Sequence, residues 1–111
     1  KRLVNINKQH FKDVKIGMCR VFEGEGGTAR FSKIDSIQVA GKTGTAENPH
    51  GDDHSMFMGF APVDNPQIAI AVIVENAGFG SQWAAPIASL MIEKYLRGYV
   101  KNTNKEKRFI E

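Results

Sequence analysis

The chain has 111 residues, of which 41% are hydrophobic and 24% are charged, and its formal net charge is +3. This composition is typical of a folded globular domain and excludes collagen-like and intrinsically disordered classes. Many basic residues lie in 97–108, where a solvated tail explains them as well as an anionic partner does. A single tryptophan, with no interleaving of aromatic and basic residues, gives no indication of a nucleic-acid partner.

The chain has a single cysteine, Cys19, so an intrachain disulfide cannot form. Because Cys19 lies in an apolar helical pattern, we expect a buried structural thiol. The longest apolar run, 68–74, is strand-sized and too short to cross a membrane. No signal peptide is visible and the first residue is not Met, so we expect a piece of a longer protein that is itself soluble.

The first half of the chain predicts a helix followed by a strand. Apolar residues recur at helical spacing from about Lys8, Asn7 is a candidate cap, and the glycine-rich segment after Glu23 ends the helix. Apolar and polar residues then alternate over 34–43, which predicts a strand with one buried face. Residues 46–54 consist of turn-formers and charges and predict a loop.

The second half predicts two strands and a helix. Strands over 55–61 and 67–75 are joined by a short turn, so they should be antiparallel neighbours. The strand 67–75 is apolar on both faces, so we expect both to be covered, by helices. A helix should begin at Gln82 or Ala84, run to Arg97 and stop at Gly98.

These elements predict an α+β fold: a three-stranded antiparallel sheet with an N-terminal and a C-terminal helix. We assign residues 1–99 to this fold and expect 100–111 to be a charged, flexible tail.

The segment 41–45, Gly-Lys-Thr-Gly-Thr, places a cation, two hydroxyls and two glycines at a strand end, which is typical of an anion-binding site. A P-loop is a poor fit. It needs a glycine where Ser36 stands and a helix directly after the motif, whereas Asn48, Pro49 and Gly51 follow here.

Lys-Thr-Gly is also a motif of penicillin-binding proteins and serine β-lactamases. The surrounding residues extend the match: 39–47 resembles the corresponding strand of class B penicillin-binding proteins, and 53–62 resembles the strand that follows it. Further similarity lies at 17–18, 27–29, 74–76 and 83–87. Over about 10–96 the chain is similar to the C-terminal part of the transpeptidase domain, of the penicillin-binding protein 2 type.

The resemblance implies roles for particular residues. Lys42 would set a positive potential in the cleft and join the proton-transfer network, and Thr43 and Thr45 would bind the carboxylate of a D-Ala-D-Ala stem peptide or a β-lactam. The Thr45 N–H would form half of the oxyanion hole, and Gly44 would keep the strand surface clear. His54 would lie at the edge of the active site, or would only make hydrogen bonds at the start of a strand. No metal or organic cofactor is implied, and a solvated loop is the preferred reading of the histidines and carboxylates in 47–54.

The family's nucleophile motifs are missing from this chain. None of its serines begins Ser-x-x-Lys or Ser-x-Asn. We therefore expect the chain alone to be inactive. The resemblance implies that its parent is a peptidoglycan D,D-transpeptidase, anchored at the outer face of the cytoplasmic membrane in a cell-wall synthesis complex. The alternatives are a fragment of a β-lactamase or β-lactam sensor, and a non-catalytic scaffold module. We also expect the strand 67–75 either to self-associate through its free edge or to be covered by a repacked helix.

Overall fold

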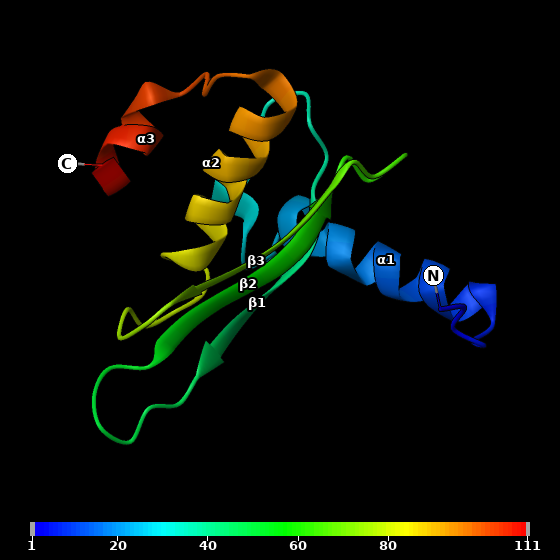
Figure 1. The fold of residues 1–111 in the computed structure, drawn as a ribbon, viewed down its shortest axis with the longest axis horizontal. Coiled ribbons are helices and arrows are strands. Elements are labelled where there is room, and N and C mark those ends of the chain that lie inside the picture. The colour runs from blue at the N-terminus through cyan, green and yellow to red at the C-terminus, as the bar shows by residue number, and fades with distance from the viewer. Residues whose placement is uncertain (1, 111) are drawn as a thin grey trace.

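A computed structural model describes residues 2–110 as a three-stranded antiparallel sheet with helices around it (Figure 1). The strand order is β1-β2-β3, which matches the α+β class predicted from the sequence. The elements, in chain order, are α1 (Lys8–Glu23), the short 3-10 helix η1 (Arg30–Ser32), β1 (Ala40–Ala46), β2 (His54–Ala61), β3 (Ile68–Val74), α2 (Ala84–Arg97) and α3 (Thr103–Ile110).

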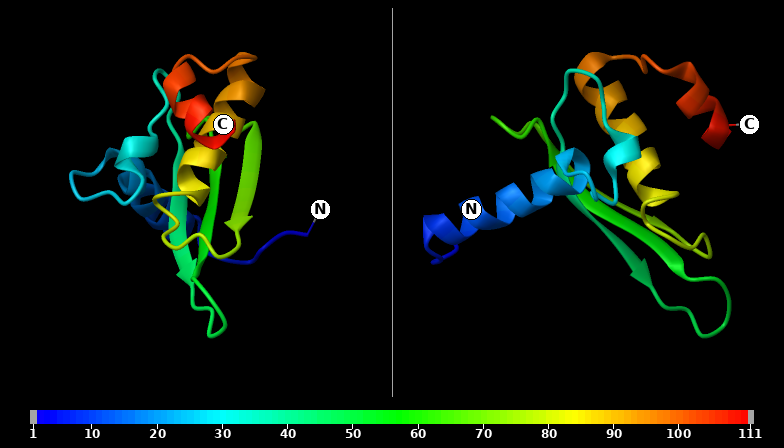
Figure 2. Two further views of the ribbon diagram at one scale, coloured as in Figure 1. Left: turned by 90° about the vertical axis from the view of Figure 1, so that its left-hand side faces the viewer. Right: turned by 180° about the vertical axis from the view of Figure 1, so that it is seen from behind.

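Helix α1 has the predicted start and end. The side chain of Asn7 accepts a hydrogen bond from the Gln9 N–H and so caps the first turn. The helix lies beyond the β1 side of the sheet and points its N-terminal end away from it (Figure 2). Its last turn anchors it, because Phe22 is 1% exposed and packs edge to face on Phe57, with ring centroids 5.8 Å apart.

The first predicted strand is shorter than the sequence indicated. Strand β1 begins at Ala40, whereas Ile34 and Ile37 form only an isolated bridge around a turn. Ser36, inside that turn, has a φ of 65°, which is incompatible with extended backbone. Ile34 and Val39 are nevertheless buried. The alternating pattern therefore reported burial of side chains and not strand pairing.

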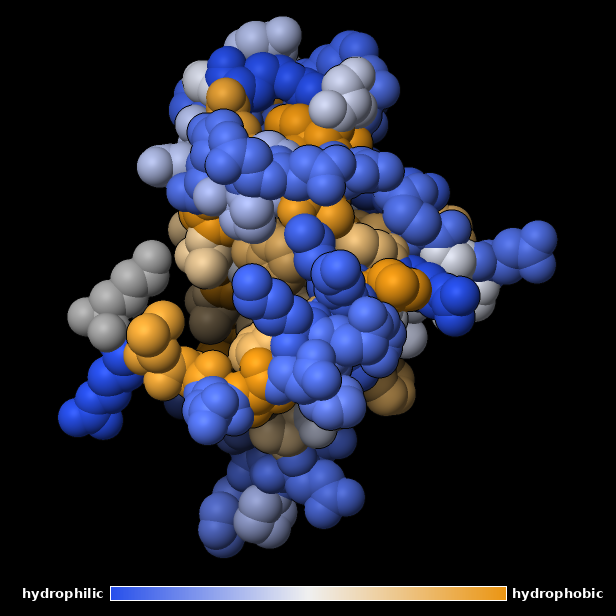
Figure 3. Space-filling model, turned by 90° about the vertical axis from the view of Figure 1, so that its right-hand side faces the viewer, coloured by the Kyte–Doolittle hydropathy of each residue, from blue (hydrophilic) through white to orange (hydrophobic). Residues whose placement is uncertain are grey.

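Strands β2 and β3 are antiparallel neighbours, as predicted, with Met58 opposite Ala71. The prediction that both faces of β3 are covered is wrong. Its residues alternate between half-buried and exposed, and Ile73 is 62% exposed. The physical reason is that α2 packs against one face of the sheet, and no other described helix covers the opposite face of β3. The surface seen from the N-terminal side likewise carries apolar patches among hydrophilic residues (Figure 3).

Helix α2 starts at Ala84 and stops at Gly98, whose left-handed φ of 87° ends the helix as predicted. Residues 103–110, placed in the predicted flexible tail, form α3 instead. Contacts with distant parts of the chain hold this helix: Arg108 donates to the carbonyl of Gln82, and the ring of Phe109 packs against Trp83. Because Gln82 and Trp83 are distant in sequence, the local sequence of 103–110 could not predict these contacts or the helix that they hold.

Candidate functional site

Strand β1 carries the residues singled out in the sequence and is an edge strand of the described sheet. Its register pairs Lys42 with Met58, Thr43 with Phe57 and Thr45 with Ser55. Because successive side chains of a strand point to opposite faces, Thr43 and Thr45 share one face with Phe57. Lys42 lies on the other face, so the expected site residues divide between the two sides of one strand.

Lys42 is exposed, and its ammonium group donates to the carbonyl of Thr43 at 2.7 Å. None of the ion pairs found within residues 2–110 involves Lys42. Its charge is therefore not neutralised by a carboxylate in this part of the protein. A compact cation in that state can attract an anionic ligand to the edge of the sheet.

The hydroxyl of Thr43 is hydrogen-bonded to the hydroxyl of Thr28, with the two oxygens 2.8 Å apart. Thr28 belongs to the loop after α1, so this bond ties that loop to β1. Thr28 is not among the site residues predicted from the sequence. The sequence feature that could have indicated it is the resemblance of 27–29 to class B penicillin-binding proteins, but that resemblance implied no role for Thr28. Thr45 is exposed on the same face as Thr43.

Two paired glycines let an aromatic ring lie close against the start of β1. A Cβ added at Gly41 would stand 2.4 Å from Cζ of Phe57, and one added at Gly59 would stand 2.8 Å from the same atom. Side chains at either position would displace the ring. Phe57 itself is 3% exposed and connects β1 with the core.

The connection between β3 and α2 packs directly on the middle of β1. A Cβ added at Gly80 would stand 2.3 Å from the carbonyl oxygen of Met56 and 2.4 Å from that of Gly44. A side chain at Gly44 would meet only ordinary contacts, the nearest being Cβ of Met56 at 3.5 Å. The close approach of the two backbones therefore requires a glycine at position 80, whereas a Cβ at position 44 would fit without a clash.

Ser55 holds this connection in place. It is fully buried, and its Oγ donates to the carbonyl of Phe79 at 3.0 Å while accepting from the N–H of Ala84, also at 3.0 Å. The second bond satisfies a backbone donor at the start of α2, where Trp83 provides no side-chain cap. From the sequence, Ser55 is predicted only as the first residue of a strand.

His54 stands opposite Ala46, at the end of the β1–β2 pair. Its Nδ1 accepts a hydrogen bond from the N–H of Asn76 at 3.1 Å, which places the proton of the neutral ring on Nε2. The loop beside it closes through Asn48, whose Nδ2 donates to Oδ1 of Asn76 at 2.7 Å. Within residues 2–110, no three histidine, cysteine or carboxylate side chains are grouped to hold a metal ion.

Comparison with known proteins places this geometry in a family. Residues 1–93 match the penicillin-binding protein transpeptidase domain. The peptidoglycan D,D-transpeptidase MrdA of Haemophilus influenzae is 40% identical over 98 residues, covering 74% of this chain and 15% of that protein. PbpA of Mycobacterium tuberculosis is 42% identical over 76 residues, covering 59% of this chain and 15% of that protein.

Solved structures agree. PBP2 of Pseudomonas aeruginosa superposes with a TM-score of 0.77 at 36% identity and covers 98% of this chain, which in turn covers 23% of that one. Penicillin-binding protein A of M. tuberculosis gives a TM-score of 0.70 at 32% identity, covering 82% of this chain and 22% of that one. The chain thus spans less than a quarter of these relatives. No helix within the described residues is long and apolar enough to cross a membrane. The chain belongs to the penicillin-binding protein transpeptidase family.

Proposed function

We propose that this chain is part of a peptidoglycan D,D-transpeptidase and that β1 binds the D-Ala-D-Ala stem peptide, or a β-lactam, along its outer edge. The observation that carries this proposal is the position of Lys42-Thr43-Gly44-Thr45 on an edge strand of the described sheet. An extended peptide can add to such an edge as a further strand, held by main-chain hydrogen bonds. The family match and the relatives named D,D-transpeptidase support the same function.

Lys42, Thr43 and Thr45 each have a distinct task in this proposal. The hydroxyls of Thr43 and Thr45 bind the substrate carboxylate, and the bond from Thr28 orients the hydroxyl of Thr43. The exposed charge of Lys42 strengthens that attraction and assists proton transfer. The backbone N–H of Thr45 stabilises the oxyanion of the tetrahedral intermediate, a contribution of about 3 kcal/mol for one such donor. His54 lines the end of the strand.

The acylated serine must come from outside this chain, since no serine here begins Ser-x-x-Lys. The longer protein would form an acyl-enzyme on that serine and pass the acyl group to an amine of a second stem peptide. We expect a fluorescent penicillin to label the longer protein and not the isolated 111-residue chain. Labelling of the isolated chain that prior boiling abolishes would overturn this assignment.

Substitution of Lys42 in the longer protein tests the role of β1. Lys42→Gln removes the unpaired charge and should slow acylation by penicillin about 100-fold, in the range typical of a group that assists proton transfer. Lys107→Gln, on α3, removes the same charge away from the motif and should leave the rate unchanged. Equal acylation rates for the native protein and Lys42→Gln would contradict the proposal.

The alternative of a β-lactamase is tested by deacylation. Penicillin-binding protein A of M. tuberculosis has been solved as acyl-enzyme complexes with ceftriaxone and with penicillin G. We expect the longer protein containing this chain to retain its acyl group in the same way. Rapid turnover of penicillin would favour a hydrolase.

We further propose that the longer protein is anchored at the outer face of the cytoplasmic membrane and works in a cell-wall synthesis complex.

We also propose that the isolated chain self-associates through the edge of β3, which is the last strand of the described sheet and exposes apolar side chains such as Ile73. Sedimentation of the chain should reveal a species larger than a monomer. A monomer at all concentrations would exclude self-association.

A further inference from the structure

The chain between Thr28 and Thr43 is closed into a loop by the bond between their hydroxyl groups. Thr28 itself lies in a hydrogen-bonded turn, because the N–H groups of Arg30 and Ser32 donate to the carbonyls three residues earlier, at 3.2 and 2.9 Å. Residues 30–32 of this turn form η1. The direction in which the Thr28 hydroxyl points is therefore coupled to the position of η1.

This turn needs support on two sides. On the side of α1, the N–H of Ala29 donates to the carbonyl of Val21 at 2.9 Å, and Ala29 is buried. One such bond fixes a point of the turn and leaves the turn free to tilt about that point. The orientation of Thr28 therefore depends on a second support, at η1.

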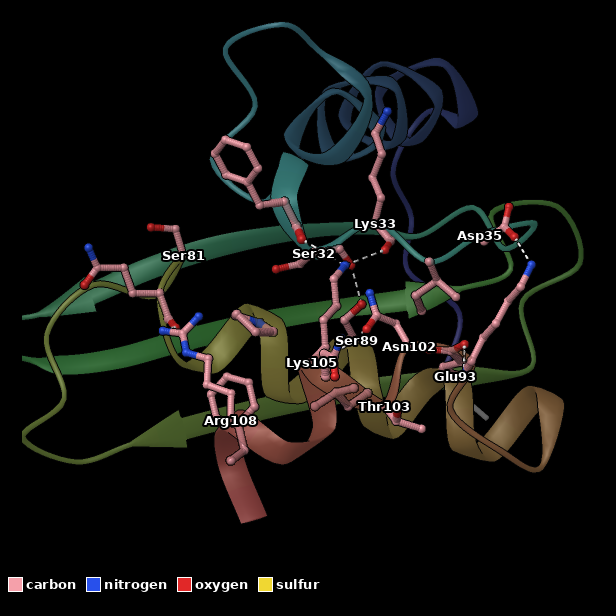
Figure 4. A pocket seen from close by; sticks show the side chains of 18 residues that line it. Ser32, Lys33, Asp35, Ser81, Ser89, Glu93, Asn102, Thr103, Lys105 and Arg108 are labelled. Atoms are coloured by element: carbon pink, nitrogen blue, oxygen red, sulfur yellow. Dashed lines mark hydrogen bonds and ion pairs between the residues drawn. The ribbon is translucent and has the colours of Figure 1, made fainter. Parts of the chain in front are cut away.

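Side chains from α2 and α3 supply the second support by holding three successive backbone carbonyls. The ammonium group of Lys105 donates to the carbonyls of Phe31 and Lys33, at 3.1 and 3.4 Å. The hydroxyl of Ser89 donates to the carbonyl between them, that of Ser32. A cavity of about 800 Å³ lies between this segment and the two helices, and Lys105 extends from α3 toward Ser32 along it (Figure 4).

The loop is held again at Asp35, near the entry to β1. Arg97, at the end of α2, donates to the backbone carbonyl of Asp35, and Lys101 forms an ion pair with its carboxylate at 2.5 Å. Lys101 and Lys105 both belong to the chain after Gly98, and we name residues 99–110 the strap. The strap thus crosses the loop that joins Thr28 to β1 and binds it at two places.

Lys105 binds nearer to Thr28 along the chain than Lys101 does. The side chain of Phe31 is 77% exposed, so it does not anchor η1 by itself. None of the ion pairs found in the described part of the chain, 2–110, includes Lys105. Its charge is directed instead at the loop carbonyls, and a charged donor makes stronger hydrogen bonds than a neutral one.

We propose that Lys105 is a positioning residue for the carboxylate site on β1. By holding η1, it keeps the hydroxyl of Thr28 in contact with that of Thr43. This role rests on the function proposed above, in which the hydroxyl of Thr43 binds the substrate carboxylate. Without Lys105, Ser89 and Asp35 still hold the loop, but η1 tilts more freely and the carboxylate binds less tightly.

The rate of acyl transfer should not depend on Lys105. The proposed oxyanion donor, the N–H of Thr45, and the charge of Lys42 lie on β1 and make no contact with the strap. Lys105 should therefore affect the binding of a β-lactam and leave its chemical step unchanged.

The test measures acylation of the longer protein by penicillin, separated into the dissociation constant of the non-covalent complex and the rate constant of acylation. Lys105→Met removes the donors and retains an unbranched side chain. It should raise the dissociation constant about fivefold, as for the loss of one hydrogen bond, at an unchanged rate constant. Lys105→Arg retains charged donors and should restore most of the affinity. Lys107→Met removes a charge from the same helix, away from the cavity, and should bind penicillin as the native protein does.

Two comparisons separate positioning from a general loosening of the fold. The methyl ester of the same penicillin lacks the carboxylate, so Lys105→Met should leave its binding unchanged. Thr28→Val removes the hydroxyl through which Lys105 acts, so adding Lys105→Met to it should cause no further loss. An equal loss for penicillin and its ester, or additive losses in the double variant, would overturn the role of Lys105.

Thr43→Val separates this inference from the function on which it rests. If Thr43→Val binds penicillin more weakly and Lys105→Met binds it normally, the role of Lys105 is wrong and the carboxylate site stands. If Thr43→Val binds penicillin as the native protein does, the carboxylate site is wrong and the role of Lys105 with it. A slower acylation step at unchanged affinity in Lys105→Met would also contradict positioning of the carboxylate.

Discussion

Replacing Gly80 by alanine tests whether the connection between β3 and α2 supports the strand that carries the motif. The new Cβ would stand 2.3 Å from the carbonyl oxygen of Met56, and ordinary contact begins at 3.4 Å, so the backbones must separate by about 1.1 Å. The two nearest atoms, the carbonyl oxygens of Met56 and Gly44, belong to the main chains of paired strands and cannot rotate away. Forcing a methyl group into such a packed site costs about 1–3 kcal/mol.

Gly17→Ala provides the matched control. Gly17 lies inside α1, and nothing stands within 4 Å of a Cβ added there. Because alanine is about 1 kcal/mol more favourable than glycine in a helix interior, this variant should become more stable. The same substitution thus has opposite signs at two glycines of one chain, for reasons that only the contacts explain.

Urea unfolding followed by circular dichroism measures both effects, and the amide shift of Gly44 reports whether β1 has moved. We expect Gly80→Ala to unfold at lower urea than the native chain, with a displaced Gly44 amide, and Gly17→Ala to unfold at higher urea with that amide unchanged. A Gly80→Ala variant as stable as the native chain, with an unmoved Gly44 amide, would refute the close packing of this connection on β1.

Three other predictions concern the core, an ion pair and the thiol. Phe57→Ala removes the ring that lies over Gly41 and Gly59 and against α1. It should lower the free energy of unfolding by about 3–5 kcal/mol in the same urea assay. A loss no larger than the loss expected for an exposed side chain would contradict the place of Phe57 in the core. The hydrogen bond and charge of Lys101 lower the pKa of Asp35, and Asp35 in turn raises the pKa of Lys101. The contribution of the carboxylate to stability is therefore present above its unfolded pKa and lost as pH falls through the lower folded value. NMR titration of Lys101→Gln should show the Asp35 pKa back in its ordinary range, and an unchanged pKa would exclude the pair. Burial raises the pKa of Cys19, so its alkylation should need a higher pH than that of a cysteine in an unstructured peptide, and an equal pH midpoint would show a fully solvated thiol.

Much of the architecture was readable from local pattern. The Asn7 cap, the period of α1 and the stop at Gly98 are local signals, and the structure confirms the helix ends they predicted. The start of β1 was predicted several residues too early. The apolar and polar residues of 34–39 alternate as in a strand, but the chain turns back at Ser36. Alternation records which side chains are buried and cannot distinguish a paired strand from a buried turn.

The sequence by itself determined the family, through Lys42-Thr43-Gly44-Thr45 and its neighbours. These residues are consecutive along the chain, so the motif can be recognised without knowing any tertiary contact. Tertiary structure alone decided that Thr28 meets Thr43 and that Gly80 rests on β1. It also decided that the charged segment after Gly98 folds back as α3. In each case the partners are far apart along the chain, so nothing in the local sequence records the contact.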